Sequence, residues 1–198
     1  MSKLLAGVRC LALQPKIALC SIEVCFFLAQ DVIEMRKLIS DRCAILPENI
    51  MFFATHTHSA PAFYEPENWI RSPAETVADA VLQAYENRQP AKIGMGYGQL
   101  QGYSINRRFM DRPIDPSISV IRIDTADDKP MSIFGTYGNH AVVMGSDNTH
   151  VSGDWPGHSS LRLESEFGDD FVAIFGQGGA GDINPLTETV RQRLAAGH

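Results

Sequence analysis

A short apolar segment that ends in two histidines constrains the fold of this chain most. Residues 50–54 form an uninterrupted apolar run, and His56-Thr57-His58 follow it. A run of this length bounded by polar residues is typical of a buried β-strand. Because side chains along a strand alternate between its two faces, the sequence predicts that both imidazoles point the same way. Such a pair at the end of a sheet is typical of a zinc site, whereas a lone histidine is more often satisfied by hydrogen bonds.

The residues before this pair predict a βαβ unit. The apolar stretch 16–29 predicts one long buried strand, and a weaker strand pattern precedes it at 4–13. Between 30 and 43, apolar residues recur among charged ones at the spacing of an amphipathic helix. This order places the histidine pair at the carboxyl end of a strand, where ligands bind in open α/β sheets.

The rest of the chain continues the alternation of helices and strands. Ser72-Pro73-Ala74-Glu75 combines a capping serine, a first-turn proline and a glutamate, and predicts a helix that reaches about residue 87. Further predicted elements are strands at 91–98, 117–124, 130–137 and 171–175, a polar loop at 98–116 and a helix at 156–167. The pattern predicts an α/β fold in a single domain over residues 1–198.

Composition narrows the classes of function. The 198 residues carry a net charge of −6 and no basic stripe, which argues against nucleic-acid binding. The most apolar stretch, 17–29, is too short for a membrane span and contains Glu23. The N-terminus resembles a signal peptide only faintly, because Arg9 and Lys16 interrupt its apolar region, so a cytoplasmic location is favoured. The cysteines form no Cys-x-x-Cys pair and are interpreted as buried free thiols: Cys10, Cys20, Cys25 and Cys43.

A glycine-rich segment at 176–181 has the letters of a dinucleotide-binding fingerprint. Pro185 follows too soon for the helix that such a fingerprint opens, and no Lys-Ser/Thr pair follows as in a phosphate loop. The glycines therefore predict a tight turn or a close approach between backbone segments.

Other polar residues are candidates for the same site as the histidine pair. His140 follows the predicted strand 130–137 much as His56 follows its own strand, which favours a shared site. His150, Asp154 and His158 are further candidate ligands, although each alone is typical of a loop or cap. Arg107, in the polar loop, is interpreted either as an oxyanion-binding residue or as a solvated surface charge.

Several of these segments, in this order, resemble the neutral/alkaline (non-lysosomal) ceramidase family, in its N-terminal catalytic domain. The similarity runs from about residue 11 to 185 and is carried by Ala54-Thr-His-Thr-His-Ser-Ala-Pro61, Ser104-Ile-Asn-Arg107, Asn139-His140, Val151-Ser-Gly-Asp154 and Gly176-Gln-Gly-Gly-Ala-Gly-Asp-Ile-Asn-Pro185. The resemblance implies a layered α/β sandwich, with a mixed β-sheet core and helices packed outside. It also implies a hydrolase that cleaves the amide of ceramide with one zinc ion.

The resemblance also implies roles for single residues. His56 and His140 match two zinc-binding histidines, His58 matches a histidine that assists at the reacting carbonyl, and Arg107 matches an active-site arginine. These roles suit the residue types, because zinc polarises a carbonyl or generates hydroxide while His and Arg stabilise negative charge on oxygen.

Two departures from the family pattern change the expected chemistry. Asn184 stands where the family has its nucleophilic serine, and an amide cannot be an activated hydroxyl, so Asn184 is expected only to line the site. The family's other zinc ligands, a Glu and a Tyr, lie beyond residue 198, which implies that the chain holds part of the domain. Catalytic zinc usually has three protein ligands, and Asp154, Asp182 and His150 stay open as substitutes.

The sequence therefore predicts a zinc-dependent hydrolase of an amide or ester, such as an N-acyl lipid, that uses a metal-polarised carbonyl or metal-bound water. One alternative is a non-catalytic remnant or binding protein that keeps the fold. Another is an unrelated zinc hydrolase, but the pair lacks the Asp-His of metallo-β-lactamases and the chain is short for an amidohydrolase barrel. The expected partners are a small-molecule or lipid-like substrate and, through exposed apolar surface, a second copy in a homo-oligomer.

Overall fold

The computed structural model describes residues 8–13, 16–168, 170–188, 190 and 192. The strands and α-helices of these residues are β1 (Val8–Leu13), β2 (Ile17–Ile22), α1 (Ala29–Arg42), β3 (Ile50–Ala54), α2 (Pro73–Glu86), β4 (Ala91–Gln99), β5 (Ser104–Asn106), β6 (Ser117–Thr125), β7 (Pro130–Tyr137), α3 (Asp154–Phe167), β8 (Val172–Gln177) and β9 (Ile183–Pro185). Two short 3-10 turns, η1 (Pro47–Asn49) and η2 (Pro66–Asn68), complete the set. Within the described residues, no helix combines the length and apolarity needed to cross a bilayer.

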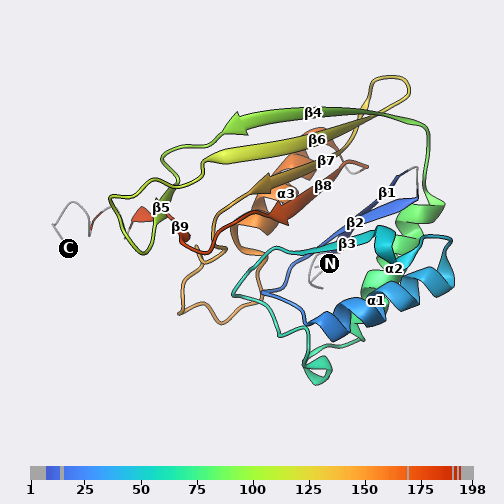
Figure 1. The fold of residues 1–198 in the computed structure, drawn as a ribbon, viewed down its shortest axis with the longest axis horizontal. Helices are drawn as coiled ribbons and strands as arrows, with labels where there is room; N and C mark the ends of the chain where they lie inside the picture. Colours follow the sequence, from blue (N-terminus) through green and yellow to red (C-terminus); the bar gives the residue numbers. More distant parts are fainter. Residues whose placement is uncertain (1–7, 14–15, 169, 189, 191, 193–198) are drawn as a thin grey trace.

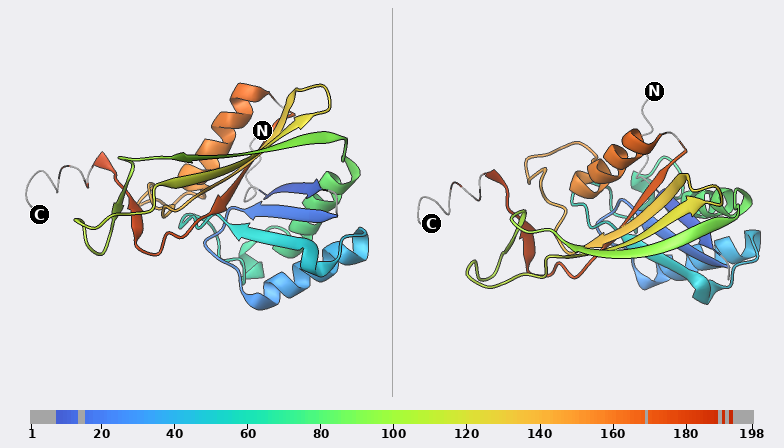
Figure 2. Two further views of the ribbon diagram at one scale, coloured as in Figure 1. Left: turned by 45° about the horizontal axis from the view of Figure 1, so that its top comes forward. Right: turned by 90° about the horizontal axis from the view of Figure 1, so that it is seen from above.

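Two main sheets are stacked with helices on their outer sides (Figure 1, Figure 2). The first sheet has the order β1-β2-β3, in which β2 and β3 are parallel and joined through α1. The second has the order β4-β6-β7-β8, with β7 and β8 parallel, while β5 and β9 form a small separate pair. The predicted α/β class, its layered arrangement and the βαβ unit are confirmed.

The core consists of two apolar clusters that hold these layers together. One lies between the first sheet and its helices, and includes Cys20, Ile22, Met35 and Val77. The other joins the two sheets and is built on Ile123, Phe134 and Ile174, with Leu19 and Phe53 packed against them. The rings of Phe53 and Phe134 lie 5.2 Å apart, so β3 and β7 are packed against each other a few residues before His56 and His140.

The long strand predicted at 16–29 is wrong beyond residue 22. The amide of Val24 donates to the carbonyl of Ile22 at 2.9 Å, and the chain turns into a loop that reaches α1. The apolar run is misleading because Glu23 leaves the strand to pair with Arg9. The short strands β5 and β9 were not predicted, because three residues are too few to display an alternating pattern.

Arg9 makes the main charged contact between β1 and α3. Its Nη1 lies 2.8 Å from Glu23 Oε1 and its Nε lies 2.8 Å from Glu164 Oε1. The Arg9 side chain is only 14% exposed, so both ion pairs are largely shielded from water. Charges held in this way are costly to leave without their partner, because little water replaces it.

We therefore expect Arg9→Met to lower the free energy of unfolding by about 3 kcal/mol, because two largely buried carboxylates lose their shared cation. Urea denaturation measures the change. The matched control is Arg122→Met, whose cation pairs with Asp124 but is 59% exposed, so its loss should change the free energy of unfolding much less. Equal losses in the two variants would contradict a special role for Arg9.

Candidate functional site

Three imidazoles meet at one end of the stacked sheets. His56 and His58 follow β3, and His140 follows β7. The ring centroids of His56 and His140 are 4.8 Å apart, those of His56 and His58 are 5.0 Å apart, and those of His58 and His140 are 6.0 Å apart. An isolated parallel bridge between Thr57 and Ala141 joins the two segments, and the amide of His58 donates to the carbonyl of Ala141. The structure thus brings together the three histidines selected from the sequence.

The reason for their proximity differs from the predicted one. β3 ends at Ala54, and His56 has φ +67°, in the left-handed region, so the pair does not share a strand face by alternation. A residue other than glycine costs on the order of 1–3 kcal/mol in such a region, and these residues cluster at functional sites. The turn at His56 directs its ring towards His58 and His140. Thr57 anchors the turn, since its buried hydroxyl donates to the carbonyl of Ser152 at 2.7 Å.

The rings of His56 and His140 make the same kind of hydrogen bond. His56 Nδ1 lies 2.9 Å from the carbonyl oxygen of Cys25, and His140 Nδ1 lies 3.1 Å from that of Ile183. A carbonyl only accepts, so each Nδ1 carries the proton and each Nε2 keeps its lone pair. Metal-binding histidines usually have this arrangement, in which the backbone carbonyl fixes the tautomer and the ring orientation. The nitrogen donor set fits zinc.

The electrostatic environment keeps two of the imidazoles neutral. Partial desolvation lowers the pKa of His58, and the nearby His56, His140 and Arg107 lower it further. Desolvation also lowers the pKa of His140, and this outweighs its hydrogen bond to Ile183, which acts in the opposite direction. Neutral rings are the form that binds a metal ion or donates one hydrogen bond to a substrate oxygen.

These shifts predict how the stability of the metal-free protein depends on pH. In the unfolded chain a histidine has a pKa of about 6.5, whereas in the folded protein the pKa values of His58 and His140 are lower. Below about pH 6.5 the unfolded state therefore binds more protons, and the free energy of unfolding falls as the pH falls further. Chemical denaturation from pH 8 to about 5 tests this. His58→Gln should flatten the profile and His158→Gln, at an exposed helical position, should not; the reverse result would contradict the assignment.

Arg107 follows β5 and is held beside the glycine-rich segment. Its Nε and Nη2 donate to the carbonyl of Gly181 at 3.0 and 2.7 Å, and its amide donates to the carbonyl of Asp182. Its positive charge contributes to the lowered pKa of both His58 and His140, so the guanidinium lies close enough to influence the imidazoles.

Asn184 lies on β9, one residue after the carbonyl that holds His140. It pairs with Ile105 of β5, and Ile183 accepts from both the amide and Nδ1 of His140. The Oδ1 atom of Asn184 is buried and has no hydrogen-bond partner among the described residues. A buried polar atom without a partner is uncommon, so this oxygen is available to accept a hydrogen bond.

The other candidate ligands have different positions. The buried carboxylate of Asp154 accepts hydrogen bonds from the amides of Val143, Met144 and Trp155. Asp182 Oδ2 accepts from the side-chain amide of Asn106 at 3.0 Å. His150 and His158 are exposed. Asp154 is therefore an anchor of the loop between His140 and α3, which agrees with the loop or capping role expected from the sequence.

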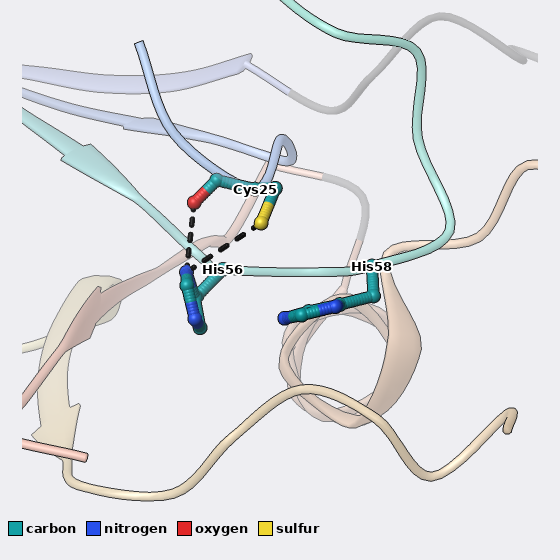
Figure 3. Close-up of side chains that lie close together, drawn as sticks. All are labelled: Cys25, His56 and His58. Atoms are coloured by element: carbon teal, nitrogen blue, oxygen red, sulfur yellow. Dashed lines mark hydrogen bonds between the residues drawn. The ribbon is translucent and has the colours of Figure 1, made fainter. Parts of the chain in front are cut away.

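Cys25 is the residue near the imidazoles that sequence reasoning missed. Its Sγ lies 3.8 Å from His56 Nδ1, and one donor atom each from Cys25, His56 and His58 lie within 4.8 Å of one another (Figure 3). Cys25 is half-buried rather than buried, and all four cysteines are free. The signal was hidden because residues 23–28 were expected to continue a strand, whereas they form the loop that passes His56.

The glycine-rich segment brings two backbone segments into contact, as predicted. A Cβ atom at Gly138 would lie 2.7 Å from the carbonyl oxygen of Gly179, and one at Gly178 would lie 2.9 Å from the amide nitrogen of Gly138. Real Cβ atoms do not approach so closely, so only glycine fits where the chain leaves β7 and β8. This contact positions the residues that follow both strands, including His140.

Comparisons with known proteins agree on one family. A family model described as "Neutral/alkaline non-lysosomal ceramidase, N-terminal" matches residues 30–193. Neutral ceramidase A of Dictyostelium discoideum is 27% identical over 173 residues, which cover 71% of this chain and 24% of that protein. A neutral ceramidase of Mycobacterium tuberculosis is 25% identical over 171 residues, covering 70% of this chain and 27% of that protein.

A solved structure agrees as well. The crystal structure of neutral ceramidase from Pseudomonas aeruginosa matches with a TM-score of 0.72 at 23% identity, and covers 86% of this chain and 31% of that chain. This likeness shows a shared fold. The chain spans about a quarter of the length of the curated relatives it matches.

Proposed function

The chain belongs to the neutral/alkaline non-lysosomal ceramidase family, and from this premise we propose that it hydrolyses the amide bond of a ceramide or a related N-acyl lipid. The observation that carries the proposal is the pair of rings with their Nδ1 atoms on backbone carbonyls, His56 on Cys25 and His140 on Ile183. Both rings keep Nε2 for one metal ion, and their centroids are 4.8 Å apart. Zinc at this position would act as a Lewis acid for the scissile carbonyl.

His58 and Arg107 stabilise the negative charge that develops on the carbonyl oxygen. His58 is neutral because desolvation and its neighbours lower its pKa, so one ring nitrogen carries a proton that it can donate. The guanidinium of Arg107 is held by the carbonyl of Gly181, which orients it without neutralising its charge. Donors that are oriented before the reaction stabilise an oxyanion without reorganisation.

In this proposal water, rather than the side chain at position 184, attacks the carbonyl carbon of the substrate. Asn184 has no hydroxyl, so no acyl ester can form on it. Attack by water forms the new C–O bond, the C–N bond breaks, and the products are a fatty acid and the free amine. The buried Oδ1 of Asn184 is placed to accept a hydrogen bond from a water or from the substrate.

The experiment compares a ceramide with an ester of the same acyl chain, each with zinc added or with a chelator. With zinc, we expect the ceramide to release its sphingoid base, which mass spectrometry measures. His58→Ala and Arg107→Ala should each lower kcat about 10²- to 10³-fold, the effect of removing one oxyanion donor. The matched controls are His158→Ala and Arg108→Ala, which remove an exposed histidine and an exposed arginine. Lipid binding without turnover under all conditions would instead identify a non-catalytic protein that keeps the fold.

A further inference from the structure

His56 has metal-binding atoms of Cys25 next to its Nδ1 nitrogen. Its Nε2 is the nitrogen left for the ion proposed with His140, whereas its Nδ1 faces Cys25. Figure 3 shows the sulfur and the carbonyl oxygen of Cys25 directed at this same nitrogen, with the ring of His58 alongside. The two nitrogens of an imidazole point away from each other, so an ion near Cys25 would occupy a different position from one near His140.

The distances around Cys25 are close to those of a metal site. Zinc binds sulfur at about 2.3 Å and imidazole nitrogen at about 2.0–2.1 Å, so tetrahedral geometry separates S and N by roughly 3.6 Å. The Sγ atom of Cys25 lies 3.8 Å from His56 Nδ1. One donor atom each from Cys25, His56 and His58 lie within 4.8 Å of one another. Side-chain rotations that move these atoms by roughly 1 Å would bring them to the separations of a zinc site.

The chemistry and exposure of these donors favour a soft cation. One thiolate and two imidazoles suit zinc and softer ions better than magnesium or calcium, which prefer oxygen. Cys25 and His56 are half-buried and His58 is exposed, so an ion can enter from solvent. Among the contacts recorded for the described residues, the Cys25 thiol makes only the one with His56.

We propose that Cys25, His56 Nδ1 and His58 form a second metal position for a thiophilic ion. Binding there moves the ring proton of His56 from Nδ1 to Nε2, breaks the hydrogen bond to the Cys25 carbonyl, and releases the thiol proton to solvent. A neutral imidazole has one lone-pair nitrogen, so His56 cannot then bind an ion through Nε2. The two positions exclude each other; this antagonism, but not the binding itself, rests on the proposed function.

The antagonism has a consequence for activity. An ion held by Cys25 takes His56 away from the position that it shares with His140. The same ion takes His58 away from the carbonyl oxygen of the substrate. Zinc in excess, or a softer ion, therefore inhibits hydrolysis at concentrations that fill the second position. Cadmium is a suitable probe, because cadmium bound to thiolate absorbs in the ultraviolet at a longer wavelength than zinc bound to thiolate.

The test titrates the metal-free protein with Cd²⁺ and follows the ultraviolet absorption of the cadmium–thiolate bond. The wild-type band should saturate at one ion per chain, vanish in Cys25→Ser, and persist in the control Cys10→Ser, which replaces another half-buried thiol. His58→Ala should weaken Cd²⁺ binding by about tenfold or more, while His140→Ala should retain the band. Circular dichroism verifies that each variant is folded.

The outcomes separate the two proposals. A wild-type protein without the band, or a band that survives in Cys25→Ser, overturns the second position. Loss of the band in a folded His140→Ala variant would mean that Cys25 and His140 bind the same ion, and this also overturns the second position. A band without any ceramide hydrolysis supports the second position and removes the proposed function, whereas hydrolysis without a band does the reverse.

Discussion

The His140→Ala variant is expected to lose the zinc ion that it would share with His56 and at least about 10³-fold of the proposed hydrolysis, because the polarisation of the carbonyl is worth several kcal/mol. His140 is 6% exposed, and its ring is oriented by the carbonyl of Ile183. Alanine leaves His56 as the only ring of the pair. One imidazole holds zinc too weakly to survive dialysis, because catalytic sites usually supply three protein ligands.

Metal content after dialysis, measured by mass spectrometry, and the rate of amide cleavage check this result. His158→Ala removes an exposed imidazole from α3 and should behave as the wild type. The fold should survive in His140→Ala, because its backbone carbonyl still accepts from Trp155 Nε1. Both proteins are compared in a Cys25→Ser background, which removes the second position, and equal zinc content with and without His140→Ala there would remove His140 from the proposed zinc position.

The Asp154→Ala variant is expected to lose on the order of 3 kcal/mol of the free energy of unfolding, because each buried donor left without an acceptor costs about 1–3 kcal/mol. Asp154 is 1% exposed, and its carboxylate accepts from the amides of Val143, Met144 and Trp155. Alanine leaves these three partly buried donors without their acceptor. The residue also has φ +52°, so the bonds offset a strained backbone.

The effect should extend to the candidate site. Asp154 fixes the loop after Ala141, and Ala141 accepts from the amide of His58. Urea denaturation measures the stability, and zinc affinity measures the displacement of the histidines. The control is Asp147→Ala, an exposed aspartate in the same loop, which should change stability by less than about 0.5 kcal/mol. Two variants of equal stability would show that the carboxylate of Asp154 is not an anchor.

Much of the fold could be predicted because its elements are long enough to carry a pattern. The 14 residues of α1 and of α2 and the strands β3, β6 and β7 are close to their predicted bounds. The capping interaction expected at Ser72 is present, since its side chain accepts from the amide of Glu75. Local signals fail where a charged residue redirects the chain, as Glu23 does after β2, or where a strand is as short as β5.

The sequence by itself selected three histidines that lie close together, and the segments that carry them. It also determined that Asn184 carries no hydroxyl, because residue identity needs no coordinates. Only the tertiary structure decided how these residues meet. The left-handed backbone at His56, the thiol of Cys25 near its Nδ1, and the buried anchor Asp154 depend on contacts between residues 10 to 95 positions apart. Hydrophobic periodicity reports which face of an element is buried, but not which distant side chain packs against it.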